Sequence, residues 1–150
     1  MDNKKALRMA GTLAIINMPL LAQAADVSPV RITDGSTYTM TADSVINTGS
    51  NTTGIFVGYK DGGTIVGDNV TVTSDGYGIQ IQTYDTGGVA GSGDCSIKLG
   101  KTIVEAKSSA VRVDSSSYGQ KATVILGDGS ILNSSANSAV YVTGKDSLLQ

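Results

Sequence analysis

A short motif returns several times along this chain and restricts its possible folds more than any other feature. It consists of a small residue followed by an apolar, a variable and a second apolar residue, and its copies begin at positions 54, 78, 110 and 139, so they lie 24 to 32 residues apart. Side chains alternate between the two faces of a strand, which puts both apolar residues of each copy on one face. We expect the leading Gly or Ala to lie at a bend too crowded for a larger side chain. The copies are Gly54–Val57, Gly78–Ile81, Ala110–Val113 and Ala139–Val142.

Two further strand signals separate successive copies. The first is an apolar segment that ends on glycine, and alternation gives it an inward pair, such as Ile97 with Leu99 or Val124 with Leu126. The second is a short aliphatic segment after that glycine. Turn-forming residues lie between the signals, and no helical period follows Ala25. The first signal occurs at Thr64–Gly67, Ile97–Gly100 and Val124–Gly127, and the second at Val70–Val72, Ile103–Val104 and Ile131–Leu132.

Two folds could be built from three short strands per repeat. An antiparallel sandwich would pair consecutive strands through hairpins, whereas a β-helix would stack each strand on its equivalent one turn later, ~4.7–4.9 Å away. A sandwich gives the sequence no reason to repeat. We therefore predict an all-β, right-handed parallel β-helix, a solenoid of about four to five rungs. The composition agrees, because only 5% of the residues are aromatic and Phe56 is the single Phe.

Two regions depart from the repeat. The part from Tyr38 to Asn47 is poorer, and Met40 and Thr41 match the glycine-ending signal only after a one-residue slip. Terminal repeats are often atypical because one side has no neighbour. The segment Tyr84–Asp94 is rich in glycine and lacks apolar alternation. We predict that it forms an exposed, mobile insertion at a corner of the coil.

The N-terminus has the pattern of an export signal. Basic residues between positions 4 and 8 precede the apolar stretch Met9–Leu21, which is shorter than the ~20 residues that a membrane-spanning helix needs. We predict a signal peptide at 1–24, recognised by the export machinery, followed by a β-helical region at 25–150. The small residues of the predicted cleavage site are Ala22, Ala24 and Ala25.

Several glycine-rich segments between about Thr37 and the end of the chain resemble rungs of pertactin-like autotransporter passengers. This resemblance implies a signal peptide, a long β-helical passenger and, in full-length relatives, a C-terminal outer-membrane barrel that exports the passenger to the cell surface. We expect no such barrel within this chain, whose last residues, Leu148–Gln150, look like the opening of a further rung. We expect it to be the start of a longer passenger. The segments are Gly62–Val66, Gly76–Ile79, Leu126–Ile131 and Asn137–Val142.

The residue types argue against catalysis and against metal or cofactor binding. The chain has no His, which removes the His-dependent triads and the common zinc sites. Cys95 is the single Cys and Glu105 the single Glu, and most Asp residues adjoin Gly or Asn, as turn-forming residues do. The net charge of -2 does not suit a nucleic-acid partner. We therefore predict no enzymatic activity, no metal and no cofactor.

The variable residues of the recurring motif form a candidate ligand face. They are expected to stack into one outward column that combines aromatic, amide and guanidinium groups, which suits binding of sugars or extended peptides. The resemblance implies an adhesin-like passenger with a host-surface protein or glycan as partner. Its expected location is the cell surface, the outer membrane or the outside of the cell. If this chain is the whole product, we expect it in the periplasm. The alternatives are a polysaccharide-binding or polysaccharide-cleaving β-helix, for which the column supplies only Arg112, and a self-assembling fibre subunit. The column is Phe56, Gln80, Arg112 and Tyr141.

Overall fold

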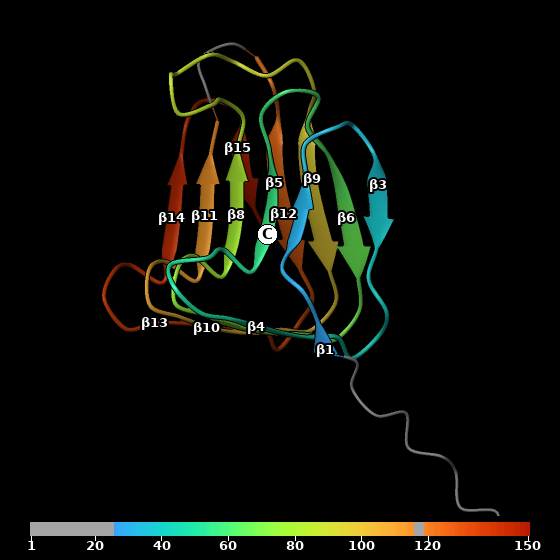
Figure 1. Cartoon of the computed structure of the whole chain (residues 1–150), viewed down its shortest axis with the longest axis vertical. Helices are drawn as coiled ribbons and strands as arrows, with labels where there is room; N and C mark the ends of the chain where they lie inside the picture. Colours follow the sequence, from blue (N-terminus) through green and yellow to red (C-terminus); the bar gives the residue numbers. More distant parts are fainter. Residues whose placement is uncertain (1–25, 116–118) are drawn as a thin grey trace, which may run out of the picture.

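The computed structural model describes residues 26–115 and 119–150, and the regular elements of this part are all strands. They form three five-stranded sheets (Figure 1). Sheet A contains β1 (Asp26–Val27), β4 (Val45–Thr48), β7 (Val70–Ser74), β10 (Thr102–Ala106) and β13 (Ile131–Ser134). Sheet B contains β2 (Val30–Ile32), β5 (Ile55–Gly58), β8 (Ile79–Gln82), β11 (Val111–Asp114) and β14 (Val140–Thr143). Sheet C contains β3 (Thr37–Thr39), β6 (Gly63–Gly67), β9 (Cys95–Leu99), β12 (Ala122–Leu126) and β15 (Ser147–Leu149).

The chain visits the three sheets in turn, so each strand pairs with strands three places away in the sequence, on both sides in the inner rungs and on one side in the end rungs. All these pairings between named strands are parallel, as between β5 and β8 or β8 and β11. Three consecutive strands therefore make one rung, and the sheets hold five rungs. This confirms the predicted parallel β-helix, because like strands lie over like strands and successive strands do not pair as hairpins.

Aliphatic columns fill the inside of the coil. In sheet B, Ile55, Ile79 and Val111 are in register, and all three are fully buried. Alternation along each strand sends every second side chain to this interior, as the sequence predicts. Burial of one such side chain stabilises the fold by roughly 1.5–3 kcal/mol, and all three sheets contribute such side chains. The other fully buried in-register sets are Val57, Ile81 and Val113 in sheet B, Ile46, Val72 and Val104 in sheet A, and Ile65, Ile97 and Val124 in sheet C.

The corner between sheets A and B explains the small residue at the head of each motif. A β-carbon on Gly54 would lie 2.9 Å from the carbonyl oxygen of Gly78 and closer still to Val72 of sheet A. Ala110, at the same corner one rung after Gly78, is fully buried. The predicted lack of room at this bend is confirmed.

The first rung differs from its prediction. The expected one-residue slip at Met40 and Thr41 is wrong, because Tyr38 pairs with Ile65 and the backbone amide of Met40 donates to the carbonyl of Val66. Tyr38 takes the place that isoleucine or valine holds in later rungs, while the Met40 side chain is buried. Because Tyr38 is polar, the sequence pattern did not reveal that it is equivalent to Ile65.

The predicted insertion lies between β8 and β9, where it projects from the corner between sheets B and C in the middle rung (Figure 1). Hydrogen bonds hold it: Tyr84 and Ala90 form an antiparallel bridge, and the amide of Gly91 donates to the carbonyl of Thr83 at 2.8 Å. The carboxylate of Asp85 accepts backbone N–H groups within the loop. The excursion is therefore a folded loop tied to the adjacent strand.

The expected signal peptide at 1–24, with Ala22, Ala24 and Ala25 around its cleavage site, lies outside the described residues. Within the described part, no helix has the length and apolar character needed to cross a membrane.

Candidate ligand-binding face on sheet B

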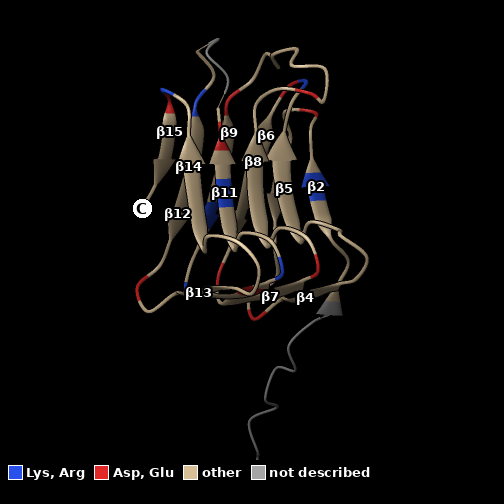
Figure 2. Cartoon of the chain, turned by 90° about the vertical axis from the view of Figure 1, so that its left-hand side faces the viewer, with Lys and Arg blue, Asp and Glu red and all other residues tan. Residues whose placement is uncertain are grey.

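The structure places the four predicted face residues in one row across sheet B. Phe56 is in register with Gln80, Gln80 with Arg112, and Arg112 with Tyr141. Arg31 of β2 pairs with Phe56 and begins the same row. We call the row of these five side chains the sheet B ladder, and Figure 2 shows its two arginines as blue bands on β2 and β11.

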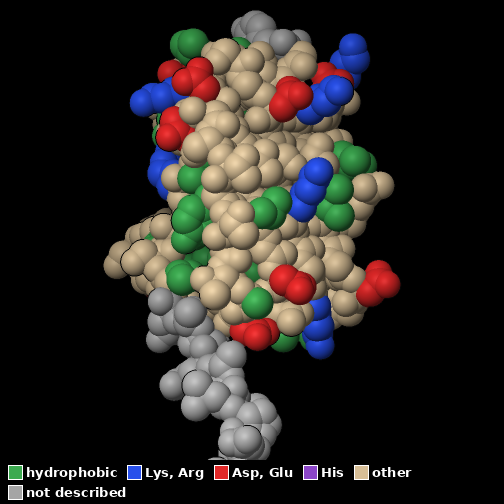
Figure 3. Space-filling model, turned by 90° about the vertical axis from the view of Figure 1, so that its right-hand side faces the viewer, with side chains coloured by type: hydrophobic (Ala, Val, Ile, Leu, Met, Phe, Trp, Pro, Cys, Tyr) green, Lys and Arg blue, Asp and Glu red, His purple; other side chains and the backbone are tan. Residues whose placement is uncertain are grey.

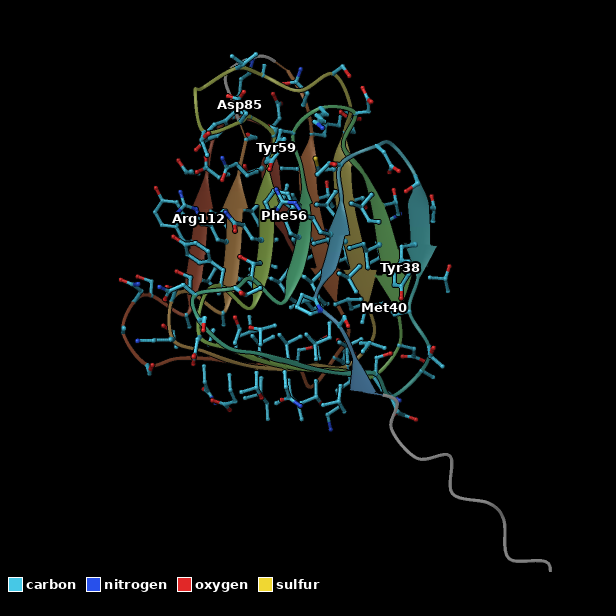
Figure 4. The ribbon with its side chains drawn as sticks, in the orientation of Figure 1. Tyr38, Met40, Phe56, Tyr59, Asp85 and Arg112 are labelled. Atoms are coloured by element: carbon cyan, nitrogen blue, oxygen red, sulfur yellow. The ribbon has the colours of Figure 1, made fainter. Side chains whose placement is uncertain are left out.

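The first part of the ladder is a closed aromatic cluster. The guanidinium carbon of Arg31 lies 4.0 Å from the ring centre of Phe56 and 5.2 Å from that of Tyr59, and its Nη2 donates to the Tyr59 hydroxyl. Figure 4 shows Phe56 and Tyr59 side by side over the sheet. A β-carbon at Gly58 would collide with the Phe56 ring, so the glycine lets the ring lie close to the sheet. Phe56 is outward-facing yet only 5% exposed, so it offers little surface to a ligand.

The middle of the ladder is a chain of satisfied amides. The Thr53 hydroxyl donates to Oε1 of Gln80 at 3.1 Å, and Nε2 of Gln80 donates to Oε1 of Gln82 at 3.1 Å. Nε2 of Gln82 then donates to the carbonyl of Tyr84 at 2.8 Å. Gln80 is 8% exposed, and its side-chain amide is already used in internal hydrogen bonds. It therefore offers little to a ligand.

The last part of the ladder places Arg112 between two tyrosines. Its guanidinium carbon lies 5.1 Å from the ring centre of Tyr77 and 5.2 Å from that of Tyr141, and its Nη1 donates to the Tyr77 hydroxyl at 2.7 Å. Its Nη2 donates to Oδ2 of the buried Asp114 at 2.9 Å. Burial disfavours the charge, but the hydrogen bonds to Asp114 and Tyr77 outweigh this and raise the pKa of Arg112. The guanidinium is held in position as a cation.

Tyr84 shares the Asp114 carboxylate with Arg112. Its hydroxyl donates to Oδ2 at 2.6 Å, and this bond, with burial and the negative charge, raises the pKa of Tyr84. A group whose pKa is higher in the folded than in the unfolded chain stabilises the fold at low pH. This stabilisation is fully present below the pKa of the unfolded chain, about 10 for Tyr, and is lost as pH rises through the pKa of the folded chain.

We therefore expect the free energy of unfolding to fall more steeply above about pH 10 in the wild type than in Tyr84→Phe, which has no phenol to ionise. Urea unfolding of both proteins at about pH 8 and about pH 11 checks this. A stability difference that stays constant across this range would contradict the link between Tyr84 and Asp114.

A groove opens where the ladder is least covered. It has a volume of about 290 Å³ and lies between the turn that contains Tyr77 and the last rung. Tyr141 is 45% exposed and the Arg112 side chain 27% exposed, so these two predicted face residues reach the surface while Phe56 and Gln80 do not. The Nε atom of Arg112 is buried without a partner among the described residues. The groove is lined by Tyr77, Ser109, Arg112, Asn137, Ser138 and Tyr141.

Several members of this face were not predicted from the sequence. Asp114 follows Arg112 by two positions on the same strand, so alternation could have placed it on the same face. The motif Val30–Ile32 could have identified Arg31, but Pro29 replaces the small residue that leads the other copies. Tyr77 and Tyr84 lie in turns, where strand periodicity gives no signal.

The remaining reactive groups do not form a second chemical centre in the described ranges. No group of three or more Cys, Asp or Glu side chains there could hold a metal ion. Glu105 accepts a hydrogen bond from Nδ2 of Asn133 at 2.7 Å on the outer face of sheet A.

Cys95 faces the interior of sheet C, where burial, with the charge of Asp94, raises its pKa to about 12. The thiolate is the reactive form, so we expect iodoacetamide to label the folded protein at about pH 8 only as fast as the chain opens. Mass spectrometry of native and urea-unfolded samples measures both rates. Labelling of the native protein at the rate of the unfolded chain would contradict this burial.

These features define a face with an accessible groove on a parallel β-helix. In comparisons with known proteins, no family model, no curated protein and no solved structure matches the chain.

Proposed function

We propose that this chain is the β-helical part of an exported, surface-displayed protein, similar to an autotransporter passenger, that acts by binding rather than by catalysis. Its partner is a host-surface glycan or protein, and the binding surface is the sheet B ladder with its groove. The coil supplies a stiff support, because each of the three inner rungs is held by the rungs on either side.

The observation that carries this proposal is the unequal distribution of side chains on the outside of the coil. The outer face of sheet B carries two arginines and two aromatic rings in one row, and Tyr59 and Tyr77 contact these arginines from beside it. On sheet C, by contrast, a corresponding outward row consists of Thr37, Thr64, Ser96, Thr123 and Leu148. In Figure 3, which faces the side opposite to Figure 2, charged side chains lie mainly toward the top and bottom of the face. Aromatic rings and arginine are the residue types most enriched at binding hot spots.

The test is attachment of beads coated with the exported full chain to cultured epithelial cells. We expect Tyr141→Ala to reduce attachment by about tenfold, the loss of about 1.4 kcal/mol. The matched control is Thr123→Ala, which removes an outward side chain from sheet C. Equal attachment by Tyr141→Ala and the wild type, or an equal loss in both variants, would count against sheet B as the binding face.

A polysaccharide-cleaving enzyme is supported less well. Such a reaction calls for a carboxylate or base that can reach the substrate, whereas Asp114 is buried and bound to both Arg112 and Tyr84. The geometry of this pair favours holding the guanidinium in place.

Self-assembly is a second candidate function, favoured by β14. Its inward residues Val140 and Val142 continue the buried columns of Val111 and Val113, yet they are 39% and 42% exposed because no described strand lies over them. An open strand edge with an aliphatic surface is a template for another strand. Light scattering and dye binding over a range of protein concentrations test this, and fibre growth that Val142→Lys abolishes would support it.

A further inference from the structure

We propose that the groove between Tyr77, Arg112 and Tyr141 binds an uncharged sugar ring of a glycan. This inference rests on the proposed binding role of sheet B and specifies its ligand. The volume of about 290 Å³ is at the lower end of small-molecule sites, so the groove suits one or two rings of a longer chain that continues over the surface.

The walls of the groove offer an apolar and a polar surface, which are complementary to the two kinds of surface on a sugar. A pyranose has a face of C–H groups and a rim of hydroxyls. The half-exposed ring of Tyr141 supplies an apolar plate with a polar edge. Asn137 and Ser138 line the same groove, and their side chains make no hydrogen bond to other described residues, so an amide and a hydroxyl are available to ligand hydroxyls.

The electrostatics favour a neutral ligand over an acidic one. The guanidinium of Arg112 is the cation in the groove, and its two terminal nitrogens already donate to Tyr77 and Asp114. The Asp114 carboxylate at 2.9 Å compensates the positive charge, and a uronate or phosphate would meet that negative charge as well. Nε of Arg112 also lacks a partner, but it is buried and so is not accessible to an acidic group in the groove.

Two features argue that the groove is prepared in advance. Arg112 is held between two rings and by two hydrogen bonds, so binding does not have to order it. The backbone of Asn137 is fixed by its amide, which donates to the hydroxyl of Ser134 at 3.1 Å. The polar and aromatic groups therefore face a ligand from fixed positions.

The experiment is calorimetric titration of the full chain with neutral cello-, malto- and galacto-oligosaccharides and, in parallel, with oligogalacturonate. We expect binding of at least one neutral series, little change in affinity between about 50 and about 500 mM salt, and weaker binding of the uronate. Tyr141→Ala and Asn137→Ala should each weaken binding about tenfold, and Tyr141→Phe should retain it because the ring remains. Tyr38→Ala is the matched control, because Tyr38 is 39% exposed but lies on the first rung of sheet C.

Three results would overturn the inference: preferred, salt-sensitive binding of the uronate; neutral binding that neither Tyr141→Ala nor Asn137→Ala changes; and no binding of any neutral series. The cell-attachment assay separates the two proposals. Attachment that is lost in Tyr141→Ala without any binding of neutral sugars would reject the sugar and retain the face. If the wild type neither attaches to cells nor binds neutral sugars, both the binding face and its sugar ligand are rejected. If Tyr141→Ala does not give a folded spectrum, Asn137→Ala decides the outcome.

Discussion

Replacing Ile97 by alanine is expected to lower the free energy of unfolding by about 2–5 kcal/mol. Ile97 is fully buried on β9 and lies in register between Ile65 and Val124, in the middle of the sheet C column. The substitution removes methyl and methylene groups whose neighbours are strands on both sides, and these strands cannot collapse into the space without breaking their hydrogen bonds. Because a rung depends on its neighbours, the loss affects the whole stack.

Urea unfolding followed by circular dichroism measures this change. Val89→Ala is the control, since Val89 is 65% exposed in the loop between β8 and β9 and its truncation should alter stability by less than about 0.5 kcal/mol. Equal, small effects of the two substitutions would show that sheet C has no packed interior column.

Replacing Gly78 by alanine is the second substitution with a large expected effect, about 1–3 kcal/mol or more. The added methyl would lie 2.7 Å from the carbonyl oxygen of Ala110 and closer still to the side chain of Val104. Both neighbours belong to the next rung, so the corner between sheets A and B would have to open. The backbone of Gly78 also donates to Ser109 at 3.2 Å, and a displaced corner weakens that bond.

Gly49→Ala is the matched control, because a β-carbon there would meet nothing within 4 Å. The same methyl group is then added to an exposed turn, and stability should stay the same or rise slightly as the unfolded chain becomes less flexible. A Gly78→Ala protein as stable as Gly49→Ala would contradict the close stacking of the corners.

The architecture could be predicted because its signals are local and repeated. Each triplet places two aliphatic side chains on one face, and the return of the triplet tells which strands stack, as for Ile79 beneath Ile55. The small residue before each triplet predicts the corner, as Gly78 illustrates. These features require no knowledge of which distant side chains touch.

The details of the candidate site depend on contacts between rungs, and the sequence does not carry them. Phe56 looks like an exposed ring at an outward position, but Arg31 from the rung before it covers it. The bond between Tyr84 and Asp114 joins a loop to a strand one rung later. Alternation gives the direction of a side chain, whereas its exposure depends on the length and shape of its neighbours in the adjacent rungs.

The first rung shows the same limit in another way. Tyr38 and Met40 occupy positions that isoleucine and glycine hold in the next rung, at Ile65 and Gly67. An end rung is packed on one side, so a long polar ring can turn to solvent and a methionine can fill the open corner. The first rung therefore keeps the strand arrangement of the later rungs although different residue types occupy its positions.

Nuclear Overhauser contacts of the β8 backbone test whether equivalent strands stack in parallel. We expect cross-strand contacts from Ile79 to both Ile55 and Val111, and from Gln80 to Phe56 and Arg112. Antiparallel contacts from β8 to β7 or to β9, with none to β5 and β11, would contradict parallel stacking.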